Sequence, residues 1–511
     1  MQILPEIKFG KKAFEIPETT KANLTFVEDV TKENFEEYVK EVIECGFDKV
    51  NRREQGGNTY VTLRKGEDAV YIYYSADIFE MRVVNEENSS YLSYSDKKRD
   101  VKVPTLLTQI SLEDFGLSYI MRLDDGRFLI IDGGWRFEPD ADKLMNYMRE
   151  NSDDEKPCIA AWIMTHAHID HYRCFLVFFD KYADCVEIEK FIYNFPDHGD
   201  TGIVSELAQY DEINVIKEFL DKAEKTGAEK YIAHTGQIYN IGNTVCEVLS
   251  SPDNTRDCPL DEINKESLVI KMQAEGQTIL WCADAYLDYS MLAERYGTYL
   301  KADILQVPHH GFCGGTKKAY DFIKPSVALI PTSDSDCYAL SYYCGATEYL
   351  IKKDCVKSFL TGTVQHTLCL PYCPPENAKA EKLAQNSDML DTCGAKTWIF
   401  GDLYSENDGD FEFSIINTTG VAANLNIDVF FEEARSFIGK IKAQASGFAV
   451  TKINIKTGKG VDGDAYFYNP NALCKKEIPK ESEFAVRVIS DIPVTVTQKG
   501  KIAAYRSSVN R

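Results

Sequence analysis

The chain has 511 residues, of which 44% are hydrophobic, and a formal net charge of −23 at pH 7. This length suggests two to four domains with ample cores, and no apolar run approaches the ~18 residues that a membrane-spanning helix needs. The negative charge repels polyanions, which argues against a long nucleic acid as a partner. We therefore expect no membrane segment and a small-molecule substrate.

Residues 1–105 carry the pattern of a small α+β module. Thr31 is the expected N-cap of a helix whose apolar residues follow helical spacing, and Gly46 can end that helix in a left-handed conformation. The polar stretch 85–100 is a candidate linker to the next domain. Runs rich in β-branched and aromatic residues predict antiparallel strands at 59–63, 69–74 and 79–84.

Residues 106–390 alternate between strand and helix patterns. The segments 118–123 and 127–132 are expected to pair across the turn at 124–126. Helices are expected at 141–149 and 212–225. Sheets with helices on their outer faces would give an α/β (α+β) domain with an αββα sandwich, in which the loops at one edge come together.

The most informative motif follows the apolar strand predicted at 159–164. The segment Thr165-His166-Ala167-His168-Ile169-Asp170-His171 places three of the chain's eight histidines beside an aspartate. A loop at the carboxyl end of a buried strand gives metal ligands a stiff support. Imidazole nitrogen and carboxylate oxygen suit Zn²⁺, Mn²⁺ or Fe. We therefore predict that His166, His168, Asp170 and His171 bind a metal.

Three more segments place chemically active side chains after predicted strands: Phe128–Gly134 with Asp132, Thr278–Asp284, and Asp303–Gly311 with His309 and His310. Together with His-x-His-x-Asp-His, these segments resemble the motifs of the metallo-β-lactamase superfamily. The resemblance implies an αββα sandwich and a binuclear metal site. It also implies that Asp132 braces the ligand loop, that Asp284 bridges two ions, and that the His-His pair supplies the last ligand.

One segment departs from that family pattern. Pro252-Asp253-Asn254-Thr255 stands where many members carry Pro-Gly-His-Thr, whose histidine is the third ligand of the first metal. Asp253 could bind instead, His234 or His198 could take the place of the missing histidine, or the first site could be weak. We therefore expect one or two Zn²⁺ ions, with Mn²⁺ or Fe as alternatives.

The details favour one branch of the family. Asn264–Ile270, the strand predicted before Asp284 and Val307–Gly311 together resemble the hydrolase domain of competence DNA-uptake proteins, which implies nuclease or phosphodiesterase chemistry. The resemblance also fits the departure at Asn254, because that branch often lacks the third-motif histidine. Phe312 replaces the usual Ser, and the later Tyr-Gly-His-Pro segment is missing near Tyr338, so the substrate does not transfer by analogy. The branch of flavodiiron oxidoreductases carries Glu where this chain has His168, which favours hydrolysis over oxygen chemistry.

The family pattern implies a mechanism in which metal ions lower the pKa of bound water to about 7 and polarise the bond under attack. The histidine of the His309-His310 pair that is not a ligand could contact the oxyanion or protonate the leaving group. This predicts hydrolysis of a phosphodiester or related ester bond of a small substrate. The first ion would be held by His166, His168 and Asp284, with Asp253 as an option, and the second by Asp170, His171, Asp284 and either His309 or His310. The predicted catalytic residues are Asp170, His309, His310 and Asp132.

Residues 391–511 are all-β by pattern, with strand-like runs at 411–416, 425–431 and 484–489 that predict a β-sandwich. The stretches 396–418 and 478–494 contain short motifs that resemble the sensory rhodopsin transducer family. That resemblance implies a β-sandwich used for contacts between subunits, as in a homo-oligomer, or with ligands. It also motivates the alternative of a non-catalytic ligand-binding or sensory protein with a retained metal site.

The cysteines and the first residues indicate where the protein works. The fifteen cysteines are scattered without a Cys-x-x-Cys pair, which is typical of reduced thiols in a cytoplasm. The segment Met1–Lys8 lacks the charged and apolar regions of a secretory signal. We therefore expect a cytoplasmic protein. Cys313, just after His-His-Gly, is interpreted as loop packing rather than as part of a pocket.

Overall fold

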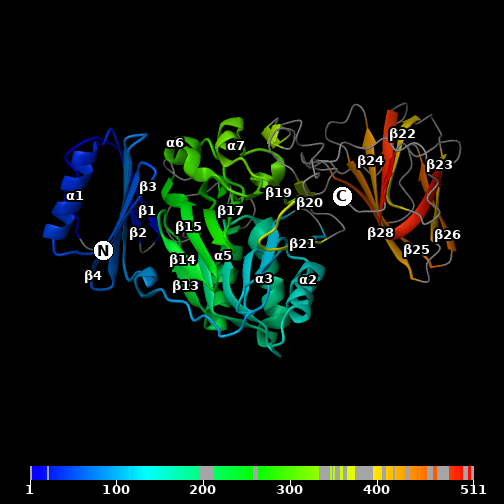
Figure 1. Cartoon of the computed structure of the whole chain (residues 1–511), viewed down its shortest axis with the longest axis horizontal. Coiled ribbons are helices and arrows are strands. Elements are labelled where there is room, and N and C mark those ends of the chain that lie inside the picture. The colour runs from blue at the N-terminus through cyan, green and yellow to red at the C-terminus, as the bar shows by residue number, and fades with distance from the viewer. Residues whose placement is uncertain are drawn as a thin grey trace. The chain divides into compact units, whose positions relative to one another are not determined.

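The protein is a mixed α and β structure with several sheets (Figure 1). Two compact units divide the chain: Met1–Thr332 with Cys344–Phe359 and His366–Ala378 form one, and Ser333–Tyr343, Leu360–Gln365 and Lys379–Arg511 form the other. The computed structural model describes residues 3–19, 22–113, 116–195, 212–254, 256, 263–332, 346–347, 349–350, 357–360, 365–374, 395–404, 410–417, 421–431, 438–447, 449–456, 464–468, 483–498 and 505–507.

The first unit begins with an antiparallel sheet in the order β1-β2-β6-β5-β4-β3, which packs against helix α1 (Lys32–Glu44). Thr31 caps α1 as predicted, since its Oγ1 accepts from the Asn34 backbone N–H at 3.2 Å. The predicted strands 59–63, 69–74 and 79–84 are confirmed, although Phe79 itself precedes its strand. The strands are β1 (Lys11–Thr19), β2 (Ala22–Glu28), β3 (Asp48–Gln55), β4 (Asn58–Lys65), β5 (Asp68–Ser75) and β6 (Glu80–Glu86).

The candidate linker at 85–100 lies against the central part of the unit. The hydroxyl of Tyr91 donates to the Ile238 carbonyl at 3.1 Å, and that of Tyr94 donates to the Asn240 carbonyl at 2.7 Å. Both rings also pack edge-on against Tyr239. These tyrosines attach the stretch to the sheet that follows, despite its polar composition.

The central part contains two sheets that face each other. The first has the order β13-β12-β10-β9-β8-β7-β21, with β11 beside β10, and the second has the order β14-β15-β16-β17-β18-β19-β20. Both contribute to one buried cluster that includes Tyr119, Ile163, Met272 and Trp281. The predicted pairing of 118–123 with 127–132 is confirmed by the antiparallel register of β8 and β9.

The strands of the first sheet are β7 (Leu106–Gln109), β8 (Ser118–Arg122), β9 (Phe128–Asp132), β10 (Cys158–Ile163), β11 (Glu187–Ile188), β12 (Lys190–Tyr193), β13 (Glu229–Ile232) and β21 (His366–Cys369). Those of the second sheet are β14 (Ile238–Ile241), β15 (Thr244–Ser250), β16 (Val269–Ala274), β17 (Gln277–Trp281), β18 (Ile304–Gln306), β19 (Val327–Ile330) and β20 (Lys357–Leu360). Helices α6 (Leu292–Tyr296) and α7 (Lys317–Ile323) lie in the connections β17–β18 and β18–β19.

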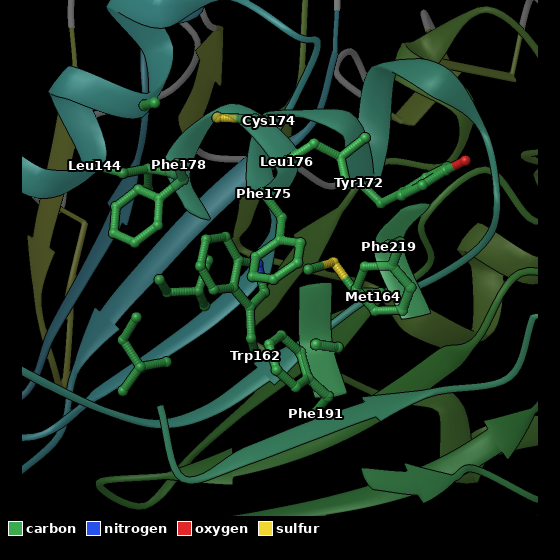
Figure 2. Close-up of a cluster of buried hydrophobic side chains, with 14 of the residues drawn as sticks. Leu144, Trp162, Met164, Tyr172, Cys174, Phe175, Leu176, Phe178, Phe191 and Phe219 are labelled. Carbon is green, nitrogen blue, oxygen red and sulfur yellow. The ribbon is translucent and has the colours of Figure 1, made fainter. Parts of the chain in front are cut away.

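Helices cover the outer face of the first sheet. They are α2 (Glu138–Glu150), α3 (Ile169–Tyr182) and α5 (Glu212–Thr226), and they share one apolar cluster with β9, β10 and β12. Figure 2 shows Trp162 of β10 beneath Phe175 and Phe178 of α3. The two phenyl rings pack edge-on against the indole, with ring centroids 5.2 and 5.3 Å from that of Trp162. Burying each such ring contributes roughly 1.5–3 kcal/mol. This core holds β10 and α3 firmly on either side of the short loop that joins them.

The second unit is all-β within the residues that the structure describes. The predicted strands 411–416, 425–431 and 484–489 lie in β23, β24 and β28 and are confirmed. Strand β28 pairs with β24 through its first half and with β23 through its second half. The buried cluster of this unit includes Phe413, Ile427 and Val488. The strands are β22 (Ala395–Tyr404), β23 (Asp410–Asn417), β24 (Ala423–Phe431), β25 (Ile438–Ala445), β26 (Ala449–Lys456), β27 (Asp464–Tyr468), β28 (Glu483–Gln498) and β29 (Tyr505–Ser507).

Parts of the stretches with the transducer-like motifs, at 405–409, 418 and 478–482, lie outside the described residues. Among the helices that the structure describes, none is long and apolar enough to cross a membrane.

Candidate metal centre

The His-x-His-x-Asp-His motif occupies the junction between β10 and α3. His166 and His168 lie in the loop, with His168 at the N-cap position of α3, and Asp170 and His171 lie in the first turn of the helix. Strand β10 runs parallel to β9, with Ile163 opposite Ile131, so Asp132 at the end of β9 reaches the same sheet edge. The apolar run before the motif is the reason for this placement, because it buries β10 on both faces.

Asp132 connects the loop after β10 to the first turn of α3. Its fully buried carboxylate accepts from the Thr165 backbone N–H at 2.7 Å, from Thr165 Oγ1 at 2.6 Å and from His171 Nδ1 at 2.8 Å. Because a carboxylate only accepts, Nδ1 of His171 carries the proton and leaves Nε2 for another partner. Gly134 adds a second connection between the segment after β9 and helix α3. Its N–H donates to the His171 carbonyl and its carbonyl accepts from the Cys174 N–H, both at 3.0 Å.

The second sheet supplies the remaining groups. Strands β17 and β18 are parallel neighbours, and the loops that follow them carry Asp284 and the pair His309-His310. Gln306, at the end of β18, joins the two loops: its Oε1 accepts from the Cys282 and Ala283 N–H groups at 2.9 and 2.6 Å. Sequence reasoning missed Gln306, and the only signal for it was one polar residue within an apolar strand.

All these side chains converge on Asp284. Its Oδ2 lies 3.3 Å from His171 Nε2, 3.2 Å from His310 Nε2, 3.7 Å from His309 Nε2 and 4.0 Å from His166 Nε2. Two sets of ligand atoms each lie within 4.8 Å of one another: His166, His168 and Asp284 form the first group, and Asp170, His171 and His310 form the second group. Asp170 Oδ2 is 3.1 Å from His310 Nε2.

The two groups fit metal ions in their donor chemistry and in what they leave unsatisfied. Oδ1 of Asp284 and Nε2 of His171 are buried and form no hydrogen bond within the described part of the chain. A buried polar atom without a partner costs roughly 1–3 kcal/mol, which a bound cation would offset. Nitrogen and carboxylate donors in this mixture are those of zinc and of related transition metals.

Four residues at the centre have a strained backbone conformation. Asp132, Ala283, His309 and His310 all have positive φ angles, between 47° and 55°. For residues other than glycine this conformation is uncommon and costs about 1–3 kcal/mol, and it tends to occur at functional sites. The strained positions lie in or next to the three loops that form the centre.

The electrostatics keep the carboxylates ionised. Burial raises the pKa of Asp284, but His310, His171 and His309 outweigh it and hold that pKa well below its usual range. Burial lowers the pKa of His310, but Asp284 and Asp170 raise it to about 9. For His309, burial lowers the pKa, and the net shift stays downward although Asp284 opposes it. The centre is therefore a compact set of mutually compensating charges, and its ionised carboxylates are in the form that binds cations.

The segment in the place of the missing third histidine contributes to neither group. The carboxylate of Asp253 binds His234 Nδ1 at 2.9 Å and accepts from the Thr235 N–H at 2.8 Å. Asn254 Oδ1 accepts from Tyr73 Oη at 2.7 Å and from the guanidinium of Arg295. This loop thus holds the N-terminal module through β5. His198, the other alternative, lies outside the described residues.

The two adjacent histidines face different partners. His310 donates through Nδ1 to the Pro331 carbonyl at 2.9 Å, and its Nε2 belongs to the second group. His309 Nδ1 lies 2.9 Å from Cys313 Sγ, and its side chain is 19% exposed. Of the two, the geometry therefore favours His310 as the ligand that the family pattern implies. Cys313 contacts the centre through His309, a contact that sequence reasoning did not expect.

Comparisons with known proteins give only distant likenesses. No family model and no curated protein matches the chain. Among solved structures, it is similar to the Anabaena sensory rhodopsin transducer, at 17% identity over 21% of this chain and 89% of that chain, with a TM-score of 0.16. It is similar to CmlA, a diiron β-hydroxylase from Streptomyces venezuelae, at 10% identity over 54% and 55% of the two chains, with a TM-score of 0.33. It is also similar to a metallo-β-lactamase from Cronobacter sakazakii, at 11% identity over 40% and 78%, with a TM-score of 0.23. At these TM-scores the likenesses do not establish a family.

Proposed function

We propose that this protein is a metal-dependent hydrolase of the metallo-β-lactamase type with a binuclear centre. The observation that carries the proposal is the convergence of two ligand groups around Asp284, from loops at one end of two facing sheets. The two facing sheets, with helices on the outer face of the first, support the αββα sandwich that this type of enzyme has. We also propose that the chain has three domains, at residues 1–105, 106–390 and 391–511.

Each residue has a defined part in this proposal. His166, His168 and Asp284 would hold the first ion. Asp170, His171 and His310 would hold the second, with Asp284 between the two. Asp132 acts through His171 and Thr165 and is a positioning residue, because its hydrogen bonds fix the tautomer and the direction of the imidazole.

When bound, such ions would lower the pKa of a water molecule to about 7 and polarise the oxygen of the bond under attack. The chain's own residues supply the rest. Asp284 and Asp170, held ionised by the surrounding histidines, place negative charge where the cations bind. The helix α3 begins at this point, and its first turn holds Asp170 in a fixed direction.

The substrate we propose is a small phosphodiester or related ester. We propose a phosphodiester because Asn264–Ile270 and Val307–Gly311 resemble segments of competence-type hydrolases. The small size rests on the net charge of −23, which lowers the encounter rate with long polyanions. Zinc as the metal, a cytoplasmic location and a homo-oligomer formed through residues 391–511 complete the proposal.

The test is turnover of bis-p-nitrophenyl phosphate and of a p-nitrophenyl ester by protein reconstituted with Zn²⁺ or Mn²⁺. We expect Asp170→Asn to lose turnover while Asp142→Asn, a change on a half-exposed residue of α2, keeps it. Metal binding without turnover of either compound would contradict the hydrolase and favour the alternative of a ligand-binding or sensory protein. The ratio of the two rates ranks the bond types.

A further inference from the structure

If Asp284 serves both ions, the second group has four ligands and the first has three. In addition to Asp284, the first group contains only His166 and His168, because the third-motif position is Asn254. That asparagine cannot turn to the centre without breaking a network: its Nδ2 donates to Ser250 Oγ at 2.9 Å and to Thr235 Oγ1 at 3.1 Å, while its Oδ1 binds Tyr73 and Arg295. A replacement ligand must therefore come from elsewhere.

Three of the imidazoles around Asp284 share one arrangement. Nδ1 of His171 binds Asp132, Nδ1 of His310 binds the Pro331 carbonyl, and Nδ1 of His166 lies 3.1 Å from Thr165 Oγ1. In each case Nε2 is left for the centre, which is how histidine ligands are oriented in metal sites. His309 has the same arrangement, with Nδ1 2.9 Å from Cys313 Sγ and Nε2 3.7 Å from Asp284 Oδ2.

We infer that His309, oriented by the Cys313 thiol, completes the first metal site in place of the absent third-motif histidine. The inference rests on the proposed binuclear function and assigns it one more ligand. When Nε2 binds a cation, Nδ1 carries the proton and donates it in a hydrogen bond to Cys313 Sγ. Cys313 is then a positioning residue, and the two adjacent histidines serve different ions, His309 the first and His310 the second.

The distances are close to those of ligands that share an ion. Two nitrogens at about 2.05 Å from a tetrahedral zinc are roughly 3.3 Å apart. Nε2 of His309 and Nε2 of His166 lie 3.7 and 4.0 Å from the same oxygen of Asp284. His309 falls outside the three-residue first group, so Nε2 must move inward on binding. The His309 side chain is partly exposed, so the protein does not enclose it completely.

The two sites differ in exposure at some of their ligands, although His166 of the first group is buried. His168 and His309 are both partly exposed, whereas Asp170, His171 and His310 are buried. The first ion would therefore lie on the solvent side, where a substrate arrives, and the second in the interior. Asp253, the alternative ligand, is engaged elsewhere, because its carboxylate is bound to His234 and Thr235.

The experiment is a Zn²⁺ titration of metal-free protein against a chromophoric chelator, with the number of bound ions counted by mass spectrometry. We expect two ions in the natural protein and one in His309→Asn, a change that removes the imidazole and suits the positive φ of 47°. His366→Asn, on a half-exposed histidine of β21, is the matched control and should keep both ions. Cys313→Ala should weaken one site by roughly 10–100-fold, and Cys313→Ser by less, because the hydroxyl retains an acceptor.

The outcomes separate the inference from the proposed function. If the natural protein binds no zinc, the binuclear function itself fails. If it binds two ions and His309→Asn also binds two with unchanged affinities, the function stands and the inference is wrong, whether or not His309→Asn loses turnover. Circular dichroism and thermal unfolding report whether each variant folds. Should His309→Asn not fold, the Cys313→Ala and Cys313→Ser pair decides: unchanged affinities in both would overturn the inference.

Discussion

Replacing Asp132 by Asn tests the physical basis of the centre without touching a proposed ligand. The carboxylate is fully buried and accepts three hydrogen bonds of 2.6–2.8 Å, two from Thr165 and one from His171. Asn keeps the size and tolerates the positive φ of 53°, but it removes the charge and turns one acceptor into a donor that faces donors. Breaking a buried charged pair costs about 3–5 kcal/mol, and we expect about 3 kcal/mol here.

The free energy of unfolding is measured in urea on metal-free protein, so that any lost metal binding does not contribute. In a zinc titration the same variant should lose roughly 10–100-fold in affinity at one site, because Nδ1 of His171 has lost its acceptor. Asp142→Asn is the control: its carboxylate is 37% exposed and paired with Lys181, and we expect a change below about 1 kcal/mol. A loss in Asp132→Asn no larger than in the control, with unchanged zinc affinity, would refute the reasoning.

Three further predictions concern the core, pH and metal removal. Phe175→Ala should lower the free energy of unfolding by about 3–5 kcal/mol, because the ring fills the space between Trp162 and α5. In the same urea experiment Phe79→Ala is the control: its residue is 57% exposed, and the change should be less than about 0.5 kcal/mol. Burial raises the pKa of Asp96, but hydrogen bonds from Arg127 and the Gly242 N–H outweigh it and lower that pKa to about 2. This stabilisation is present above the unfolded pKa of 3.8 and is lost as pH falls through 2. Asp96→Asn should therefore be about 2 kcal/mol less stable than the natural protein at pH 7 and equally stable near pH 1.5. An equal difference in stability at both pH values would contradict this prediction. Removing the ions with a chelator should lower the melting temperature, and restoring zinc at 100 times its Kd should return about 2.7 kcal/mol; a melting temperature that ignores both treatments would contradict a folded-state metal site.

Local signals predicted the elements well where the chemistry was local. Thr31 before the helical pattern was a sufficient signal for the N-cap, and the apolar run 159–164 predicted the buried strand β10. The three ligand segments and the segment that carries Asp132 were also visible, because each places a polar residue at the end of an apolar strand or directly after it. Their convergence on one carboxylate could not be predicted from spacing alone, because it depends on how the two sheets pack through residues such as Trp281.

The sequence was least informative where a polar residue serves a distant partner. Asp253 and Asn254 could be seen as a departure from a motif, but not as the attachment point for Tyr73 of the N-terminal module. The polar stretch 85–100 suggested a linker because composition does not show that Tyr91 and Tyr94 bind the second central sheet. Cys313 likewise gave no signal that it would meet His309, since that contact depends on a tight turn at two positive φ angles.

The most direct test of a binuclear centre around Asp284 is the metal content of protein purified without added metal or chelator, measured by mass spectrometry for the natural chain and for Asp284→Asn. Because Asp284 lies between both ligand groups, we predict close to two ions per chain in the natural protein and a loss at both sites in the variant. A natural protein that holds no metal even after reconstitution, or a variant that keeps both ions, would contradict the account.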